Sequence, residues 1–135
     1  MTFETFVQDM LASFPFLREE CSAYMDDEEP LAKIAFGCVL APWLERCLET
    51  RDIANIIKIC QFFEASALDS RIDERLSDLI AIELGEWLPG LRERNLLLSH
   101  LGHETQQIRS AFSVNSSLVR VFFTKLLGAV PDPDG

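Results

Sequence analysis

The sequence predicts an all-α fold, a compact bundle of about six to eight helices around a central buried third helix. Apolar side chains recur every three or four residues along nearly the whole chain, which is typical of helices that bury one face. Apolar residues make up 48% of the 135 residues, enough for the core of one domain. The run 119–123 could also form a strand, but no other segment offers it a partner. We expect one domain over residues 1–130 and a disordered tail over residues 131–135.

The first two helices are predicted from one apolar stripe and one proline. Thr2 is placed to cap the first helix, and Pro15 ends it and begins the second. The stripe of the first helix consists of Phe3, Phe6, Val7, Met10, Leu11 and Phe14. The second helix carries Leu17, Cys21, Tyr24 and Met25.

The third helix, predicted over residues 31–48, has apolar side chains almost all round its circumference. Such a helix is buried on most sides, which places it in the centre of the bundle. Pro30 suits its first position. Gly37 and Pro42 predict a kink or a break inside it.

Two longer helices follow. The fourth is predicted over residues 52–68, with a stripe made of Ile53, Ile56, Ile57, Cys60 and Phe63. Ser70 and Asp73 resemble a capping box that would start the fifth helix. Its predicted stripe is Ile72, Leu76, Leu79, Ile80 and Trp87.

Beyond the Pro89-Gly90 turn the pattern leaves alternatives open. Residues 91–113 form either one helix or two short ones separated near Gly102. Residues 118–127 are apolar enough for a last helix.

Charge is spread unevenly over the chain, whose net charge is −10. Residues 1–90 contain 18 acidic and 7 basic side chains, a net charge of −11, whereas residues 91–131 contain 2 acidic and 5 basic ones, a net charge of +3. Like charge repels phosphate backbones and anionic membranes, so we expect neither nucleic acid nor a membrane as partner. The remaining expectation is a basic protein partner, with the oligomeric state left open.

Eight acids are the predicted partner-binding residues. Four of them follow one another in a loop, and the other four lie at outward positions of predicted helices. They are Asp26, Asp27, Glu28, Glu29, Glu45, Glu49, Asp73 and Asp78. The loop lacks the alternating ligands and the central glycine of an EF-hand, and a merely solvated loop is the alternative.

Two further acids, Glu64 and Glu83, fall inside the apolar stripes of the fourth and fifth helices, so we expect buried carboxylates there. A carboxylate that faces a core has to be paired, hydrogen-bonded or neutralised. Either each accepts hydrogen bonds from nearby groups, or the two meet across adjacent helices as an acid–base or ligand pair.

Motifs for catalysis or cofactor binding are missing from the sequence. There is no G-x-S-x-G, G-x-G-x-x-G or phosphate-binding loop, and His100 and His103 are not at the usual zinc spacing. The four cysteines stand singly at apolar positions, as buried thiols in a reducing compartment do. With neither a secretory signal nor a membrane-spanning run, we expect a cytoplasmic protein that is not an enzyme and carries no cofactor or metal.

Several short segments resemble a bacterial family of small, uncharacterised, acidic helical proteins. They are Phe14-Pro15-Phe16-Leu17-Arg18, Phe36-Gly37, Trp43-Leu44, Ile56-Ile57 and Phe62-Phe63-Glu64. In size, acidity and lack of catalytic motifs the chain is also similar in type to the immunity proteins that neutralise bacterial toxins. The resemblance implies no site residues. Two hypotheses result: an inhibitor that blocks a basic toxin, or a helical adaptor that binds through an apolar groove or self-associates.

Overall fold

The computed structural model describes residues 1–24 and 32–114, and every regular element within these ranges is helical. The predicted all-α fold is therefore confirmed. The α-helices are α1 (Phe6–Ser13), α2 (Arg18–Ser22), α3 (Ala32–Ile34), α4 (Ala41–Glu49), α5 (Ile53–Asp69), α6 (Glu74–Trp87), α7 (Arg94–Leu98) and α8 (His103–Val114). Short 3₁₀ turns are η1 (Pro15–Leu17), η3 (Ser70–Ile72) and η4 (Leu88–Gly90), and η2 (Ala35–Leu40) is a π-helical segment.

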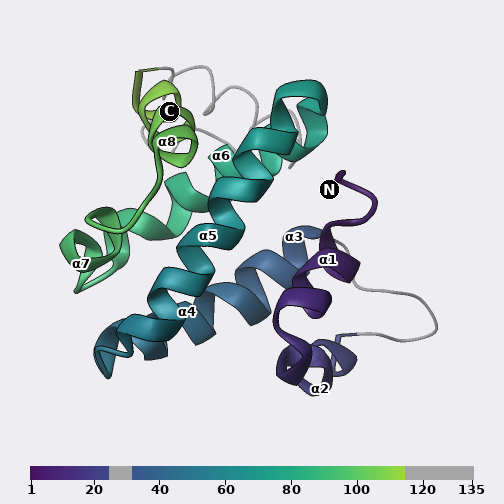
Figure 1. Cartoon of the computed structure of the whole chain (residues 1–135), viewed down its shortest axis with the longest axis vertical. Helices are drawn as coiled ribbons and strands as arrows, with labels where there is room; N and C mark the ends of the chain where they lie inside the picture. The colour runs from purple at the N-terminus through teal and green to yellow at the C-terminus, as the bar shows by residue number, and fades with distance from the viewer. Residues whose placement is uncertain (25–31, 115–135) are drawn as a thin grey trace, which may run out of the picture.

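The longest helix, α5, runs diagonally across the middle of the molecule (Figure 1). It contacts α4, α6 and α8, while α1 and α2 lie on one side of it and α7 and α8 on the other. Aromatic rings join α1 to α5, because the Phe62 ring lies 5.6 Å from the rings of both Phe6 and Phe14, centroid to centroid. The two halves of the chain are therefore held together around one helix.

The core is built on stacked phenylalanines. Phe36 stacks on Phe6 at 5.8 Å and on Phe63 at 5.5 Å, and none of the three has any solvent exposure. Full burial of such a side chain stabilises a fold by roughly 1.5–3 kcal/mol. This cluster fixes η2 against α1 and α5.

The predicted third helix is a continuous helical path through α3, η2 and α4, and it is buried on most sides as expected. The predicted irregularity takes the form of the π-helical segment η2, which contains Gly37 and ends just before Pro42. Pro42 has no N–H for the carbonyl four residues earlier, and its ring would clash with that carbonyl in a regular α-helix. A π-helical turn moves the hydrogen-bond register and avoids the clash.

Two predicted helix starts are wrong. The first helix begins at Phe6, and Thr2 hydrogen-bonds with Thr5 ahead of it. The fifth begins at Glu74, because Asp73 is itself the cap and accepts a hydrogen bond from the Leu76 N–H at 3.2 Å. Ile72 therefore precedes the helix and is 95% exposed, although the stripe predicted it to be buried.

The fourth predicted helix is correct in extent and is capped by Asp52, whose side chain accepts from the Asn55 N–H at 3.3 Å. Its stripe is rotated from the prediction, since Ile53 is 40% and Ile57 39% exposed. The buried face of α5 consists of Ile56, Ile59, Cys60, Phe62, Phe63, Ser66 and Ala67.

Residues 91–113 contain two helices, α7 and α8, with Gly102 between them. The predicted last helix at 118–127, the tail at 131–135 and Pro30 lie outside the described residues. The domain boundary at residue 130 stays a prediction. None of the helices that the structure describes is both long and apolar enough to cross a bilayer.

The four cysteines do not share one environment. Cys21, Cys47 and Cys60 are buried, and burial raises the pKa of each thiol, that of Cys60 to about 12. Cys38 is exposed, contrary to the prediction, because it projects from the outward side of η2.

Candidate functional site

The predicted partner-binding acids on α4 lie on its outward face. Glu45 and Glu49 are both exposed and are one helical turn apart. Arg46, next to Glu45, forms a 3.3 Å ion pair with Glu20 of α2. The basic group of this face is thus already paired, and Glu45 and Glu49 keep uncompensated charges.

A second acidic stretch lies on α6, where Glu74 and Asp78 are exposed one turn apart. Partial burial, and then the negative charge of Glu74, raise the pKa of Asp78. Two carboxylates that repel each other on a helix surface are better satisfied by an approaching cation.

Asp73 is used inside the fold. Besides capping α6, it accepts a hydrogen bond from the Phe3 N–H at 2.8 Å, and this bond is the main cause of its lowered pKa. It joins the N-terminal segment to α6. The four acids of the loop, Asp26 to Glu29, lie outside the described residues.

Glu64 is half-buried at the N-terminus of α8. Its carboxylate accepts hydrogen bonds from the Glu104 N–H at 2.7 Å, the Thr105 N–H at 3.3 Å and the Thr105 hydroxyl at 3.1 Å. A carboxylate at this position satisfies backbone N–H groups that have no partner in the helix and interacts favourably with the helix dipole. Gly102 permits the approach, because a Cβ there would overlap the carboxylate.

Glu83 is much more deeply buried than Glu64. It is 3% exposed and points toward η2. A Cβ on Gly37 would be 3.1 Å from Oε2, and Oε1 has no hydrogen-bond partner in the described part of the chain. Burial raises the pKa of Glu83 to about 7, with a further increase from Glu86 and an opposing effect of Lys33.

The two carboxylates therefore have different neighbours, and no hydrogen bond joins them within residues 1–24 and 32–114. In the same ranges no group of three or more His, Cys, Asp or Glu side chains could hold a metal ion. Of the two histidines, His100 contacts the Leu96 carbonyl oxygen at 3.0 Å, and His103 begins α8 at the surface.

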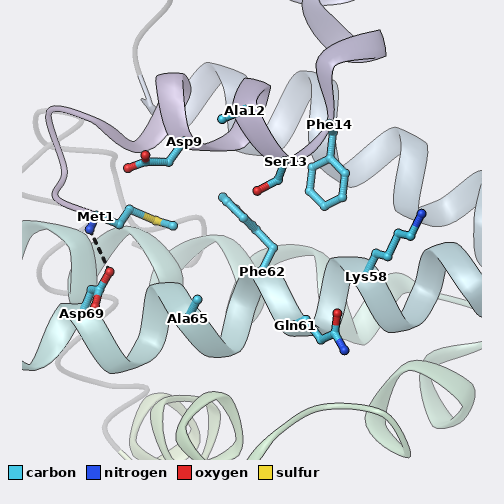
Figure 2. Close-up of a pocket in the computed structure, with 10 residues that line it drawn as sticks. All are labelled: Met1, Asp9, Ala12, Ser13, Phe14, Lys58, Gln61, Phe62, Ala65 and Asp69. Carbon is cyan, nitrogen blue, oxygen red and sulfur yellow. Dashed lines mark hydrogen bonds and ion pairs between the residues drawn. The ribbon is translucent and has the colours of Figure 1, made fainter.

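A groove of about 580 Å³ runs between α1 and α5 (Figure 2). Phe62 and Phe14 form its floor, and the short side chains of Ala12, Ser13 and Ala65 keep it open. Its two ends carry different charges. Asp9, Asp69 and the Met1 amino group lie at one end, and Lys58 with Gln61 lies at the other.

Sequence reasoning missed this groove because its walls come from two helices that are distant in sequence. The available signal was the placement of small residues at outward positions of α1 and α5, next to charged ones. Small outward residues are common on helices, and only their juxtaposition makes a groove.

Comparison with protein-family models, curated proteins and solved structures finds no match for this chain.

Proposed function

We propose that this chain is a non-catalytic inhibitor of the immunity-protein type, which binds and blocks a basic bacterial toxin in the cytoplasm. One observation carries the proposal. Glu45, Glu49, Glu74 and Asp78 are exposed on regular helices, and none forms an ion pair among the residues that the structure describes. Fixed, uncompensated negative charges on a folded surface attract a cationic protein and orient it during encounter.

Inhibition in this proposal is steric and electrostatic. Toxins that act on nucleic acid need a basic cleft for phosphate groups, and an acidic helical surface is complementary to such a cleft. The loop acids Asp26, Asp27, Glu28 and Glu29 are included in the proposed surface on the basis of sequence. No turnover is required, because a bound inhibitor excludes the substrate.

The first test is co-expression with the protein encoded by the neighbouring gene. We expect that neighbour to be toxic alone, harmless with this chain and co-purified with it. A neighbour that is harmless alone and does not co-purify contradicts the proposal.

The second test measures association rates with that partner. Replacing Glu45, Glu49 and Glu74 by Gln and Asp78 by Asn should slow association about tenfold at low salt, with little difference at 1 M salt. The matched control replaces four ion-paired acids, Glu4, Glu20, Glu93 and Glu104, by Gln, which removes the same charge. Equal slowing in both variants contradicts a role for the four unpaired acids.

A helical adaptor or self-associating module is the second candidate, and the exposed apolar corner at η3 favours it. Ile72, at the end of η3, is 95% exposed, and Leu68, near the end of α5, is 46% exposed. Large apolar side chains exposed in this way are frequent at the centre of interfaces. Light scattering over a concentration series separates the candidates: self-association that Ile72→Asp abolishes supports the module, and a monomer at every concentration contradicts self-association.

A further inference from the structure

We propose that the groove between α1 and α5 binds an extended segment of the basic partner, with a lysine or arginine beside Asp9 and an acidic residue beside Lys58. This inference rests on the proposed function, because it names the part of the partner that the chain recognises. The floor supports it first. Phe62 and Phe14 offer apolar ring surface, and the small side chains along both walls leave room for a backbone (Figure 2).

The amino group and side chain of Met1 already lie at the acidic end of the groove. The Met1 ammonium group donates to Asp69 Oδ2 at 2.8 Å, and its unbranched side chain is only 8% exposed. The Ser66 hydroxyl, which donates to the Phe62 carbonyl oxygen at 2.8 Å, lies 3.1 Å from the Met1 sulfur. A positive charge and a linear apolar chain are therefore already seated together at this end (Figure 2). Lysine combines the same two features in one side chain.

Asp9 provides the charge that a second cation would bind. Its Oδ2 accepts a hydrogen bond from the Thr5 hydroxyl at 2.8 Å, and no ion pair involves Asp9 within the described ranges. The hydrogen bond to Asp69 is the main reason why the pKa of the Met1 amine is raised, and the negative charges of Asp69, Asp9 and Asp73 add to it. Three carboxylates therefore act on one ammonium group near this end, so the net charge of these four groups is negative.

The opposite end sets the length and polarity of the occupant. Lys58 lies eleven residues before Asp69 on α5, about 16 Å along the helix, and Asp9 lies at the Asp69 end of the groove. An extended chain covers that distance in about five residues. A segment with a basic residue at one position and an acidic residue five positions away therefore matches both ends, with small or apolar residues over Phe62.

The test is a nuclear magnetic resonance titration of the labelled full chain with the peptide acetyl-Lys-Ala-Ala-Ala-Ala-Glu-amide. We expect shifts of the amides of Ala12, Ser13 and Ala65, and affinity about fivefold lower for Asp9→Asn. The matched control, Glu19→Gln, removes the same charge from an exposed site that lies outside the groove and outside the four proposed partner-binding acids. A peptide with norleucine in place of lysine should bind the wild-type chain as weakly as the lysine peptide binds the Asp9→Asn variant.

Two results overturn the groove proposal: shifts confined to other surfaces, or equal weakening by Asp9→Asn and Glu19→Gln. The same variants in the complex separate this proposal from the proposed function. If the partner binds the Asp9→Asn variant as tightly as the wild type, the groove proposal is contradicted and the proposed inhibitor function is not. If the peptide binds in the groove but no basic protein partner of the chain is found, the inhibitor function is contradicted and the groove proposal is not.

Discussion

The junction of α5 with α8 and the junction of α6 with η2 each contain one inward carboxylate, and the two are surrounded differently. Glu64 accepts three hydrogen bonds from the start of α8. Glu83 is more deeply buried, next to Gly37, and its Oε1 has no partner among the described residues. The two environments therefore differ both in the number of hydrogen-bond donors and in the depth of burial.

This difference has an energetic meaning. A charged acceptor that receives backbone N–H groups at a helix start stabilises both the helix and the contact between helices. A buried carboxylate that leaves an oxygen without a donor destabilises the fold in its charged form and is better protonated. Glu64 therefore joins two helices, whereas Glu83 makes the packing of α6 on η2 dependent on pH.

The largest effect is expected from Glu64→Ala. The variant leaves two N–H groups of α8 and the Thr105 hydroxyl without their acceptor, so we expect a loss of about 3 to 4 kcal/mol in the free energy of unfolding. Urea denaturation measures it, and amide hydrogen exchange at Glu104 and Thr105 should accelerate. Glu45→Ala, on the exposed face of α4, serves as control with a change within about 0.5 kcal/mol. Equal losses for both would remove the distinction.

The next largest effect is expected at Glu83, and its size depends on pH. Its pKa is raised from 4.5 to about 7, so between these values the folded protein holds a proton that the unfolded chain has released. Stability therefore falls as the pH rises through this window, by about 3 kcal/mol once the pH is above 7.

Glu83→Gln should remove this dependence. We expect the variant to match the wild type near pH 4 and to exceed its free energy of unfolding by about 3 kcal/mol at pH 8. Glu45→Gln is the matched control and should retain the wild-type slope. A wild-type profile that is flat between pH 4.5 and 7 would contradict the description of Glu83.

A smaller effect on stability is expected from Gly37→Ala, which tests whether the Glu83 side chain requires the space left by glycine at position 37. A Cβ at residue 37 would press on Oε2, so Gly37→Ala should cost about 1 kcal/mol in the wild type. In a Glu83→Ala background the pressure is gone, and the better helix propensity of alanine should make the same change neutral or stabilising. The double-mutant cycle then gives a coupling of at least about 1 kcal/mol. Gly90→Ala is the control, since nothing lies within 4 Å of a Cβ there.

The smallest effect is expected at the surface of the Glu64 junction, where Arg71 pairs with Glu104. Because the Arg71 side chain is 62% exposed, Arg71→Ala should cost less than about 1 kcal/mol, and nothing at 1 M salt. Thermal unfolding at two salt concentrations measures it. A loss as large as that of Glu64→Ala would show that the ion pair, and not the carboxylate cap, holds α8.

Periodicity was sufficient to predict the helical bundle and to place Glu64 and Glu83 at inward positions. It could not distinguish them, because their neighbours are distant in sequence: the N–H groups that reach Glu64 are 40 and 41 residues away. The prediction misplaces Ile72 because Ser70 and Asp73 both suit a cap. The structure uses Asp73, which accepts hydrogen bonds from the Leu76 N–H within the helix and from the Phe3 N–H far away in sequence. The groove depends on two helices at once, and no single stripe encodes it.

The four cysteines can be used to measure local opening of the fold. A maleimide reacts with an accessible thiolate. Cys21, Cys47 and Cys60 are protected, because they are buried and the pKa of each thiol is raised. Cys38 is exposed and accessible to the reagent. A short labelling pulse should therefore add one mass increment to the folded chain and four to the unfolded chain. Because the protected thiols lie on α2, α4 and α5, the order in which further labels arrive would reveal which helix opens first.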